Sequence, residues 1–309
     1  MITVTLLGTA ATMPLPERAL TSALLSFGGR SILFDCGEGT QSAARKAHVS
    51  LMKTDLIALT HYHGDHIFGL PGLLQTFACL GRSAPLWLTG PEGLEDILST
   101  VLTLSGPLPY PVYKLHLSGK AVSPADVLPG WSSRCSLIPF ATRHRVPSFG
   151  YRFLLRRPGA FHPESAAALQ VPQPLWHVLQ GGDPVTLADG RVITPDMVMG
   201  EERKGLSVVF SGDTSPCPAL TENARNADLF ICEATYGSDE DSDHAGQYGH
   251  CTFSQAAKTA ADAHAKRLWL AHFSQIMGNP ADFLPNASSV FPEAVCGTDG
   301  LSITLRYET

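Results

Sequence analysis

Short apolar runs bounded by turn residues dominate the first third of the chain. The pattern predicts strands over residues 2–8, 22–27, 30–35, 56–60 and 86–89, and helices over 70–80 and 92–104. Gly28-Gly29 separates the second and third runs, which indicates that the chain begins as antiparallel sheet. The run 56–60 is continuously apolar, as expected for a strand buried on both faces, and the polar loop 61–66 follows it.

The second half repeats this alternation of strands and helices. Apolar runs predict strands over 206–210, 228–233 and 267–271, and an alanine-rich segment predicts a helix over 253–264. Each of the three strands ends in polar residues, as the strand 56–60 does. Alternating strands and helices with polar residues at the strand ends predict an α/β fold with a catalytic edge.

Residues 156–204 differ from the rest of the chain. They are rich in proline, glycine and glutamine, and they show no strong periodicity that would support a long element. We therefore predict a single catalytic domain over residues 1–309, with an inserted arm at about 156–204.

Composition narrows the class of protein. Of 309 residues, 44% are hydrophobic and 16% are charged, which supports a sizeable core and excludes a disordered chain. No apolar stretch approaches the ~18 residues that a membrane helix needs, and the N-terminus is typical of a first strand rather than an export signal. Seven scattered cysteines without a CxxC pair favour a reducing cytoplasm. The net charge of −6 argues against coating nucleic acid through bulk charge, although it leaves room for a local basic face.

The strongest chemical signal is the loop after residue 60. His61, His63, Asp65 and His66 place three imidazoles and a carboxylate within six residues, where protonated rings would repel each other. Such a density of nitrogen and oxygen ligands suits Zn²⁺, with Mn²⁺ or Fe as alternatives. Alternation along the loop lets His61 and His63 serve one metal while Asp65 and His66 turn toward a second.

Two metals need further ligands from other strand ends. His144, Asp213 and His272 each follow a β-like run and are the candidates. Taken singly, each histidine is equally explained as a hydrogen-bonded side chain, and Asp213 as a turn former.

Taken together, these residues and their surroundings resemble the metallo-β-lactamase fold, an αβ/βα sandwich with a dinuclear metal site. More narrowly, the chain is similar to the tRNase Z family, endonucleases that remove 3′ trailers from precursor tRNA. The similarity spans nearly the whole chain and includes residues 33–41, 59–74, 90–94, 150–152, 211–214, 233–235 and 249–250. The extension Gly69-Leu-Pro-Gly-Leu-Leu74, and Glu233-Ala-Thr235 with Gly249-His250, are more specific to this family than the metal loop.

The resemblance implies two Zn²⁺ per chain and a role for each matching residue. His61, His63 and His144 would hold one ion, Asp65, His66 and His272 the other, and Asp213 would bridge them. A hydroxide between the metals would attack the phosphodiester. His250, oriented by Glu233, would protonate the leaving 3′-oxygen; Asp65 is a candidate proton acceptor, and Asp35 would orient a metal ligand.

The chain departs from the family pattern at several places. Cys232 stands where the family usually has histidine, the loop 14–19 keeps only its proline and Arg18, and Phe-Ser-Gln-Ile-Met follows His272. The arm stretch 172–182 contains no lysine. The remaining candidates for RNA contacts are Arg18, Arg143, Arg145, Arg152, Arg156 and Arg157. A basic strand exposed to solvent, with no role in RNA binding, explains the five arginines from Arg143 to Arg157 almost as well.

The favoured interpretation is a cytoplasmic, zinc-dependent endoribonuclease that acts on precursor tRNA. The resemblance also implies a homodimer in which the arm reaches the partner's active site. One alternative is another dinuclear metallo-hydrolase of the same fold, acting on a small phosphodiester, sulfate ester or lactone. The altered loop 14–19 and the arm favour this alternative, and the Glu233 and His250 pair argues against it. The second alternative is a non-catalytic RNA-binding or scaffold homologue; such a protein would be expected to have lost metal ligands, and every expected ligand is present here.

Overall fold

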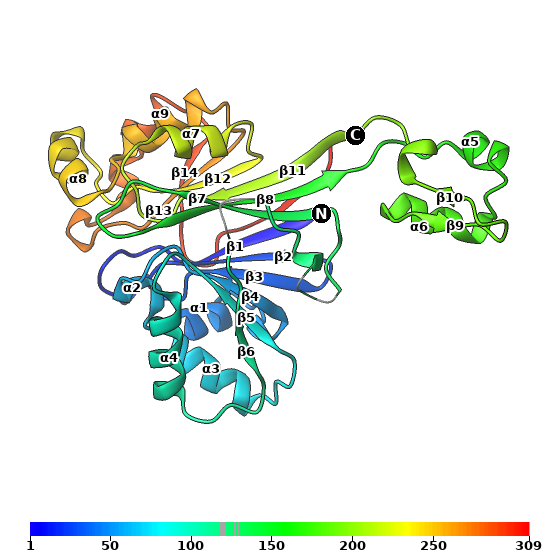
Figure 1. Cartoon of the computed structure of the whole chain (residues 1–309). Coiled ribbons are helices and arrows are strands. Elements are labelled where there is room, and N and C mark those ends of the chain that lie inside the picture. The colour runs from blue at the N-terminus through cyan, green and yellow to red at the C-terminus, as the bar shows by residue number, and fades with distance from the viewer. Residues whose placement is uncertain (118–120, 127, 129, 309) are drawn as a thin grey trace.

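The computed structural model describes residues 1–117, 121–126, 128 and 130–308. Two mixed sheets pack face to face, and helices cover the outer face of each (Figure 1). This arrangement confirms the predicted αβ/βα sandwich.

The first sheet has seven strands in the order β15-β1-β2-β3-β4-β5-β6. Their bounds are β1 (Ile2–Gly8), β2 (Ser22–Phe27), β3 (Arg30–Phe34), β4 (Thr54–Ala58), β5 (Leu86–Thr89), β6 (Val112–Lys114) and β15 (Ser302–Leu305). Pairing is antiparallel from β15 to β3 and parallel from β3 to β6. The helices α1 (Thr40–Lys46), α3 (Leu70–Cys79) and α4 (Leu94–Ser105) pack against its outer face, α1 through Ala43 and Ala44 and the other two mainly through leucines and Phe77.

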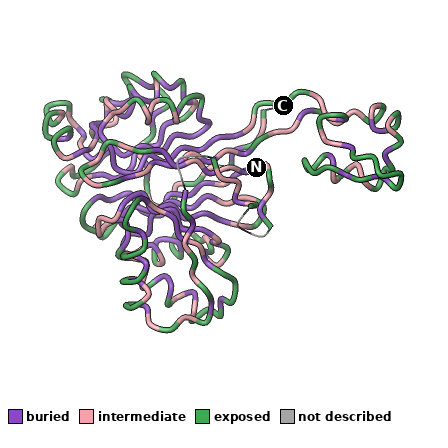
Figure 2. Tube along the Cα trace, viewed as in Figure 1, coloured by how far each residue is buried: buried purple, intermediate pink, exposed green. Residues whose placement is uncertain are grey.

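The second sheet has six strands in the order β14-β13-β12-β11-β8-β7. Their bounds are β7 (Cys135–Ala141), β8 (Phe149–Arg157), β11 (Arg203–Phe210), β12 (Leu229–Glu233), β13 (Leu268–Ala271) and β14 (Ala294–Cys296). The helices α7 (Pro218–Ala224), α9 (Phe253–Asp262) and α10 (Leu284–Ser288) lie on its outer side, where small alanines of α9 allow close packing. A third apolar core fills the space between the sheets, so the interior of the sandwich is the most continuously buried part of the chain (Figure 2).

Residues 158–202 form a small lobe between the ends of β8 and β11, which run antiparallel to each other (Figure 1). The lobe contains α5 (Pro163–Ala168), α6 (Trp176–Gly181) and the paired strands β9 (Val185–Thr186) and β10 (Val192–Ile193). Ala166, Leu179 and Ile193 are among the residues of its own small apolar core. That residues 1–309 form one catalytic domain with an arm inserted at about 156–204 stays a prediction.

Several predicted element boundaries differ from the structure by one to three residues, and two segments between residues 54 and 67 need correction. The strand expected over 56–60 is Thr54–Ala58, because the Thr60 backbone N–H donates to the Asp35 carboxylate instead of continuing the ladder. The segment 61–66 is not loop throughout: Gly64–Ile67 forms a helical turn, α2, in which the His66 N–H donates to the His63 carbonyl. The strands β6, β8, β14 and β15, and β9 and β10 of the lobe, are absent from the strands predicted from the sequence, which indicates β7 only as a β-like run before His144. Among the described residues, no helix has the length and apolar character needed to cross a membrane.

Candidate metal centre

The candidate ligands come from the ends of five different elements. His61 and His63 follow β4, and Asp65 and His66 lie on α2 directly after them. His144 follows β7, Asp213 follows β11 and His272 follows β13. Because both sheets contribute, the cluster lies where the two halves of the sandwich meet.

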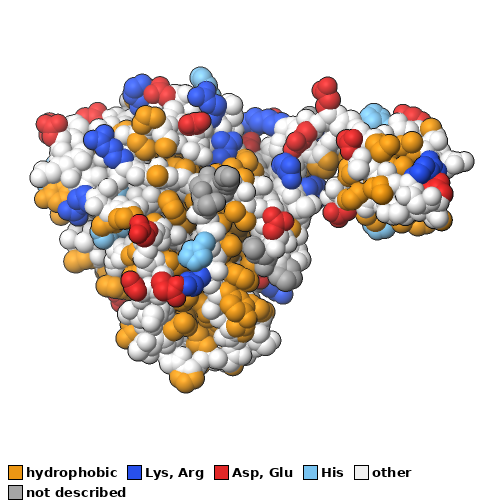
Figure 3. Space-filling view, viewed as in Figure 1, with side chains coloured by type: hydrophobic (Ala, Val, Ile, Leu, Met, Phe, Trp, Pro, Cys, Tyr) orange, Lys and Arg blue, Asp and Glu red, His pale blue; other side chains and the backbone are white. Residues whose placement is uncertain are grey.

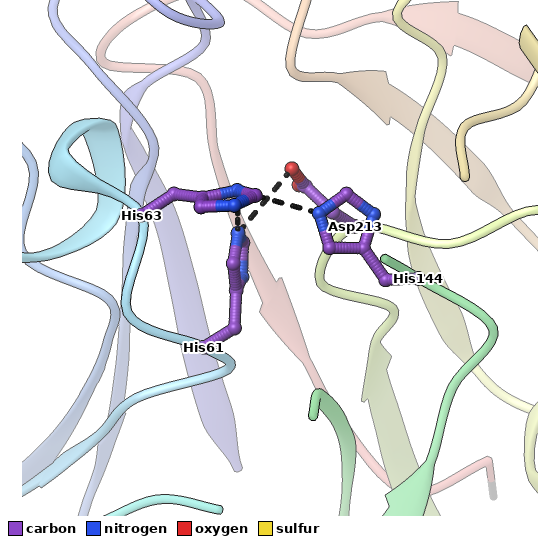
Figure 4. Close-up of side chains that lie close together, drawn as sticks. All are labelled: His61, His63, His144 and Asp213. Atoms are coloured by element: carbon purple, nitrogen blue, oxygen red, sulfur yellow. Dashed lines mark hydrogen bonds and ion pairs between the residues drawn. The ribbon is translucent and has the colours of Figure 1, made fainter. Parts of the chain in front are cut away.

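The first group of facing donor atoms contains His61, His63, His144 and Asp213 (Figure 4). His63 Nδ1 lies 2.9 Å from His61 Nε2 and 3.3 Å from His144 Nε2. Asp213 Oδ2 lies 3.6 Å from His61 Nε2. One atom from each of these four residues lies within 4.8 Å of the others.

The second group contains Asp65, His66 and His272. His66 Nε2 and His272 Nε2 are 3.3 Å apart, and Asp65 Oδ2 lies 3.4 Å from His272 Nε2. The other oxygen of Asp213, Oδ1, lies 3.4 Å from His66 Nε2 and 3.3 Å from His272 Nε2. The two oxygens of Asp213 therefore face the two groups.

Hydrogen bonds on the outer sides of the rings fix which nitrogen faces the centre. His66 Nδ1 lies 2.8 Å from an Asp35 oxygen and His144 Nδ1 lies 2.9 Å from the Gly249 carbonyl; both oxygens accept only, so each Nδ1 carries its proton. The Nε2 lone pairs of His66 and His144 then point inward. Lone pairs converging on one centre repel each other unless a cation lies between them. These residues consequently fit a metal ion, and imidazole nitrogen with carboxylate oxygen is a donor set that suits Zn²⁺.

Two threonine hydroxyls hold further rings in place. Thr60 Oγ1 lies 3.0 Å from His61 Nδ1, and Thr235 Oγ1 lies 2.9 Å from His272 Nδ1. Neither threonine is among the site residues predicted from the sequence. The sequence offers one indication of their role, which is their position: Thr60 directly precedes His61, and Thr235 lies two residues after Glu233.

Asp35 lies beneath the second group and is fully buried. It adopts a positive φ of 56°, and its carboxylate accepts from Thr60 N at 2.7 Å, from Thr60 Oγ1 at 2.8 Å and from His66 Nδ1. Burial raises the pKa of Asp35, although His66 opposes the effect. Burial also disfavours a charged His66, but Asp213 and Asp35 outweigh it and hold the pKa of His66 well above its usual range.

The other members of the centre show the same competition between burial and charge. Burial, reinforced by His66, lowers the pKa of His61, and burial together with His144 lowers the pKa of His63. Burial alone would raise the pKa of Asp213, but the surrounding imidazoles reverse this and lower it. Burial and charge thus favour neutral His61 and His63 beside a charged Asp213, which is the ionisation state that metal ligands require. His66 differs, since its two carboxylate neighbours favour the charged ring, and a metal ion would take the place of its Nε2 proton.

His250 and Glu233 form a second functional unit beside the two groups. His250 Nδ1 lies 2.9 Å from Glu233 Oε1, and the buried Glu233 carboxylate also accepts from the backbone N–H groups of Thr214 and Thr235, both at 3.0 Å. Burial disfavours a charged His250, but Glu233 outweighs it and raises the pKa of His250 to about 9. The ring of His250 lies 5.5 Å from that of His272, centroid to centroid. A protonated imidazole is thus held next to the candidate metal ligands.

The candidate RNA-binding arginines divide into separate locations. Arg143 and Arg145 flank His144 and are exposed. Arg18 donates to the Gly278 carbonyl at 3.0 Å, which ties its loop to the segment after His272. Figure 3 shows basic and acidic side chains interspersed on the visible face of the molecule and on the arm.

The remaining three arginines lie along β8 toward the arm. Arg152 and Arg156 line a hollow of about 540 Å³ together with Lys204, whereas Arg157 Nη1 donates to the Glu308 carbonyl at 2.6 Å. An extended strand rises ~3.3 Å per residue, so Arg157 lies roughly 26 Å along the strand from Phe149. The structure therefore does not gather all five arginines into one cluster.

Comparison with known proteins identifies the family. Residues 17–248 match the family model described as the metallo-beta-lactamase superfamily. Ribonuclease Z of Lachnoclostridium phytofermentans is 39% identical over 308 residues, covering 100% of this chain and 99% of its own, and that of Clostridium tetani is 38% identical over the full length of both.

Solved structures agree with these relatives. The crystal structure of the short form of human tRNase Z is 27% identical with a TM-score of 0.68, covering 99% of this chain and 100% of its own. The metallo-beta-lactamase fold protein YhfI of Bacillus subtilis, 20% identical over 98% of both chains, has a TM-score of 0.69 and shares the fold. These findings confirm the resemblance seen in the sequence. The chain belongs to the metallo-β-lactamase superfamily and, within it, to the ribonuclease Z family.

Proposed function

We propose that this protein is a metal-dependent endoribonuclease that removes the 3′ trailer of precursor tRNA. The observation that carries the proposal is the His250 and Glu233 pair, held beside two groups of metal-type donors that share Asp213. A phosphodiester hydrolase that releases a poor leaving group needs a proton donor next to its metals, and this chain provides one. The full-length similarity to proteins named Ribonuclease Z supports the choice of substrate.

Two Zn²⁺ ions per chain are the proposed cofactors, and Mn²⁺ or Fe is compatible with the same ligands. His61, His63 and His144 would hold one ion, and Asp65, His66 and His272 the other. Asp213 would bridge them, because its two oxygens face the two groups. When bound, such ions lower the pKa of water and stabilise the negative charge that develops on the phosphoryl oxygens.

The protein's own residues move the protons. His250 donates to the 3′-oxygen of the leaving ribose, and Glu233 holds the His250 ring and favours its protonated form. Asp65 Oδ2 accepts from the Thr12 backbone N–H at 2.7 Å and is the acceptor for the proton of the attacking water. Asp35 keeps the proton of His66 on Nδ1, so that Nε2 stays free for the metal.

RNA binding is assigned to groups outside the metal centre. Arg143 and Arg145 lie beside His144, Arg18 borders the segment after His272, and Arg152, Arg156 and Arg157 extend toward the arm. We assign phosphate contacts to these guanidinium groups. A homodimer would bring the arm of one copy to the active site of the other. All seven cysteines are free thiols, which supports a cytoplasmic location.

Cleavage of a 3′-extended precursor tRNA tests the function. The purified protein, loaded with zinc or manganese, is expected to make a single cut near the acceptor end, and the His63→Ala variant is expected to make none. If the protein hydrolysed bis(p-nitrophenyl) phosphate but left the precursor tRNA intact, the proposed metal chemistry would stand and the proposed tRNA substrate would be wrong.

A further inference from the structure

Aromatic side chains continue from His250 toward the surface of the molecule. The Tyr236 ring lies 6.3 Å from that of His250, the His244 ring lies 5.4 Å from Tyr236, and the Tyr248 ring lies 4.6 Å from His244, all centroid to centroid. His244 and Tyr248 lie on α8 (Ser242–Tyr248). His244 is exposed, whereas Tyr236 and Tyr248 are half-buried.

Arg145 completes this row from the other side of the site. Its guanidinium carbon lies 4.8 Å from the centroid of the Tyr248 ring, a cation–π distance, and the side chain is exposed. Arg145 is the residue after His144, so a phosphate chain bound at the metal centre would pass next to it. The aromatic row and this guanidinium form one surface, which we call the stacking platform: Arg145, Tyr236, His244 and Tyr248.

The platform is fixed to the catalytic centre by the backbone. His144 Nδ1 donates to the Gly249 carbonyl at 2.9 Å, which joins the loop of Arg145 to the end of α8. Gly249 has φ +77°, and a Cβ there would lie 2.9 Å from His144 Nδ1 and 3.0 Å from His144 Cα. Only glycine permits this approach without strain, so the position of Tyr248 relative to His144 is set by the chain rather than by flexible side chains.

The charged residues around the platform favour one orientation of a bound nucleotide chain. Arg143 and Arg145 lie on the His144 side, whereas four carboxylates precede or begin α8: Asp239, Glu240, Asp241 and Asp243. Phosphates are attracted to the first side and repelled from the second. A nucleotide chain on the platform would therefore place its backbone along the arginines and its bases over the aromatic rings.

We infer that the stacking platform binds the unpaired nucleobase immediately 5′ of the scissile phosphodiester. The inference rests on the proposed function, in which His250 protonates the 3′-oxygen of that same nucleotide. Since the row begins at His250, the base attached to the leaving ribose is the one that reaches it. Aromatic rings and arginine planes are the surfaces on which single-stranded bases stack, without selecting a particular base. The platform residues are positioning residues: they hold the leaving nucleotide in line and take no part in proton transfer.

The test combines a substitution in the protein with a change in the RNA, and measures each change alone and both together. Tyr248→Leu removes the ring at similar volume, Tyr248→Phe keeps the ring, and a precursor tRNA with an abasic site 5′ of the cut removes the base. Tyr113→Leu is the control, because Tyr113 is an exposed tyrosine that packs against Trp87 and lies on β6, an edge strand of the first sheet that β5 separates from β4. Melting temperatures of the variants check that they fold.

Stacking is worth ~1–3 kcal/mol per base, so Tyr248→Leu should lower kcat/KM for the intact precursor roughly 5- to 150-fold. The abasic precursor should lose a similar factor with the wild-type protein, and Tyr248→Leu should cause little further loss on it. Tyr248→Phe, which keeps the ring, should lose much less than Tyr248→Leu, and Tyr113→Leu should cleave the intact precursor like the wild type.

Two failures are distinguishable. If the Tyr248→Leu and abasic losses multiply independently, or if neither change reduces cleavage, the platform does not bind this base although the enzyme cleaves tRNA. If the wild-type protein leaves the precursor intact, both the function and the platform are wrong.

Discussion

Replacing Asp35 with asparagine should weaken metal binding without disturbing the fold. The substitution is isosteric, and the retained carbonyl oxygen can still accept from the Thr60 backbone N–H that Asp35 Oδ1 holds at 2.7 Å. The Thr60 hydroxyl can rotate from donor to acceptor. Only His66 meets a conflict, because the new amide N–H₂ replaces the oxygen that lies 2.8 Å from its Nδ1.

The conflict forces a change of tautomer. A neutral His66 facing an amide donor must accept at Nδ1 and carry its proton on Nε2. That proton would then point at His272 Nε2, 3.3 Å away, and at Asp213 Oδ1, 3.4 Å away, and Nε2 could no longer act as a ligand. Loss of such an orienting partner typically costs 10- to 100-fold in metal affinity or activity, or about 1.4–2.7 kcal/mol.

Zinc affinity measured by competition with a chromogenic chelator checks this expectation, together with hydrolysis of bis(p-nitrophenyl) phosphate. Asp228→Asn is the matched control: Asp228 is also buried, accepts from Ser207 N at 2.8 Å and pairs with Lys266 at 2.9 Å, but it contacts no imidazole. It should lower stability while leaving zinc affinity unchanged. Wild-type zinc affinity in Asp35→Asn would refute the role of Asp35 in selecting the His66 tautomer.

Three further outcomes are expected. His250→Gln should slow cleavage of precursor tRNA by roughly 10²- to 10⁴-fold but affect bis(p-nitrophenyl) phosphate far less, because p-nitrophenolate leaves without a proton; equal losses on both substrates would contradict the proton-donor role. Chelation should abolish activity and lower the melting temperature, and zinc at 100 times its Kd should restore about 2.7 kcal/mol of stability; a melting temperature insensitive to zinc would argue against binding at this centre. Tyr151→Phe should cost about 1–3 kcal/mol in urea unfolding, since the buried Tyr151 hydroxyl donates to the Leu59 carbonyl at 2.7 Å; an unchanged midpoint would show that another donor satisfies that carbonyl.

The sequence predicts the strands that are buried on both faces and much less of the rest. The apolar runs 56–59, which includes most of β4, and 229–232, which is β12 without its final glutamate, are visible in the sequence without knowledge of a partner strand. β8 is different: Tyr151, Phe153 and Leu155 face the core, and the positions between and after them are Arg152, Leu154 and Arg156. The two arginines interrupt the apolar run, so the period-two pattern is short and weak in the sequence. The pairing of β1 with β15 joins the two ends of the chain, and no local signal records it.

The candidate site follows the same division. Each proposed ligand follows a strand, either in the next loop or, for Asp65 and His66, on α2 shortly after β4. The residue types and these positions therefore predict the group before any geometry is known. The stacking platform could not be found in this way, because Arg145 meets Tyr248 only through the contact of His144 with Gly249, more than a hundred residues away. The opposite happens with the five arginines from Arg143 to Arg157. They are close in sequence, which suggests a cluster, but an extended strand places Arg157 far from Arg143.

The placement of the donors connects the centre to the stability of the sandwich. In each of the two groups, some ligands follow strands of the first sheet and others follow strands of the second: His61 and His63 face His144, and Asp65 and His66 face His272. A cation bound in either group therefore joins the two sheets at their shared edge, in addition to the apolar core between them. Asp213 contacts both groups, so it couples them through a single side chain. Metal binding would therefore strengthen the contact between the two halves that the apolar core already provides, since neither sheet alone presents a complete set of ligands.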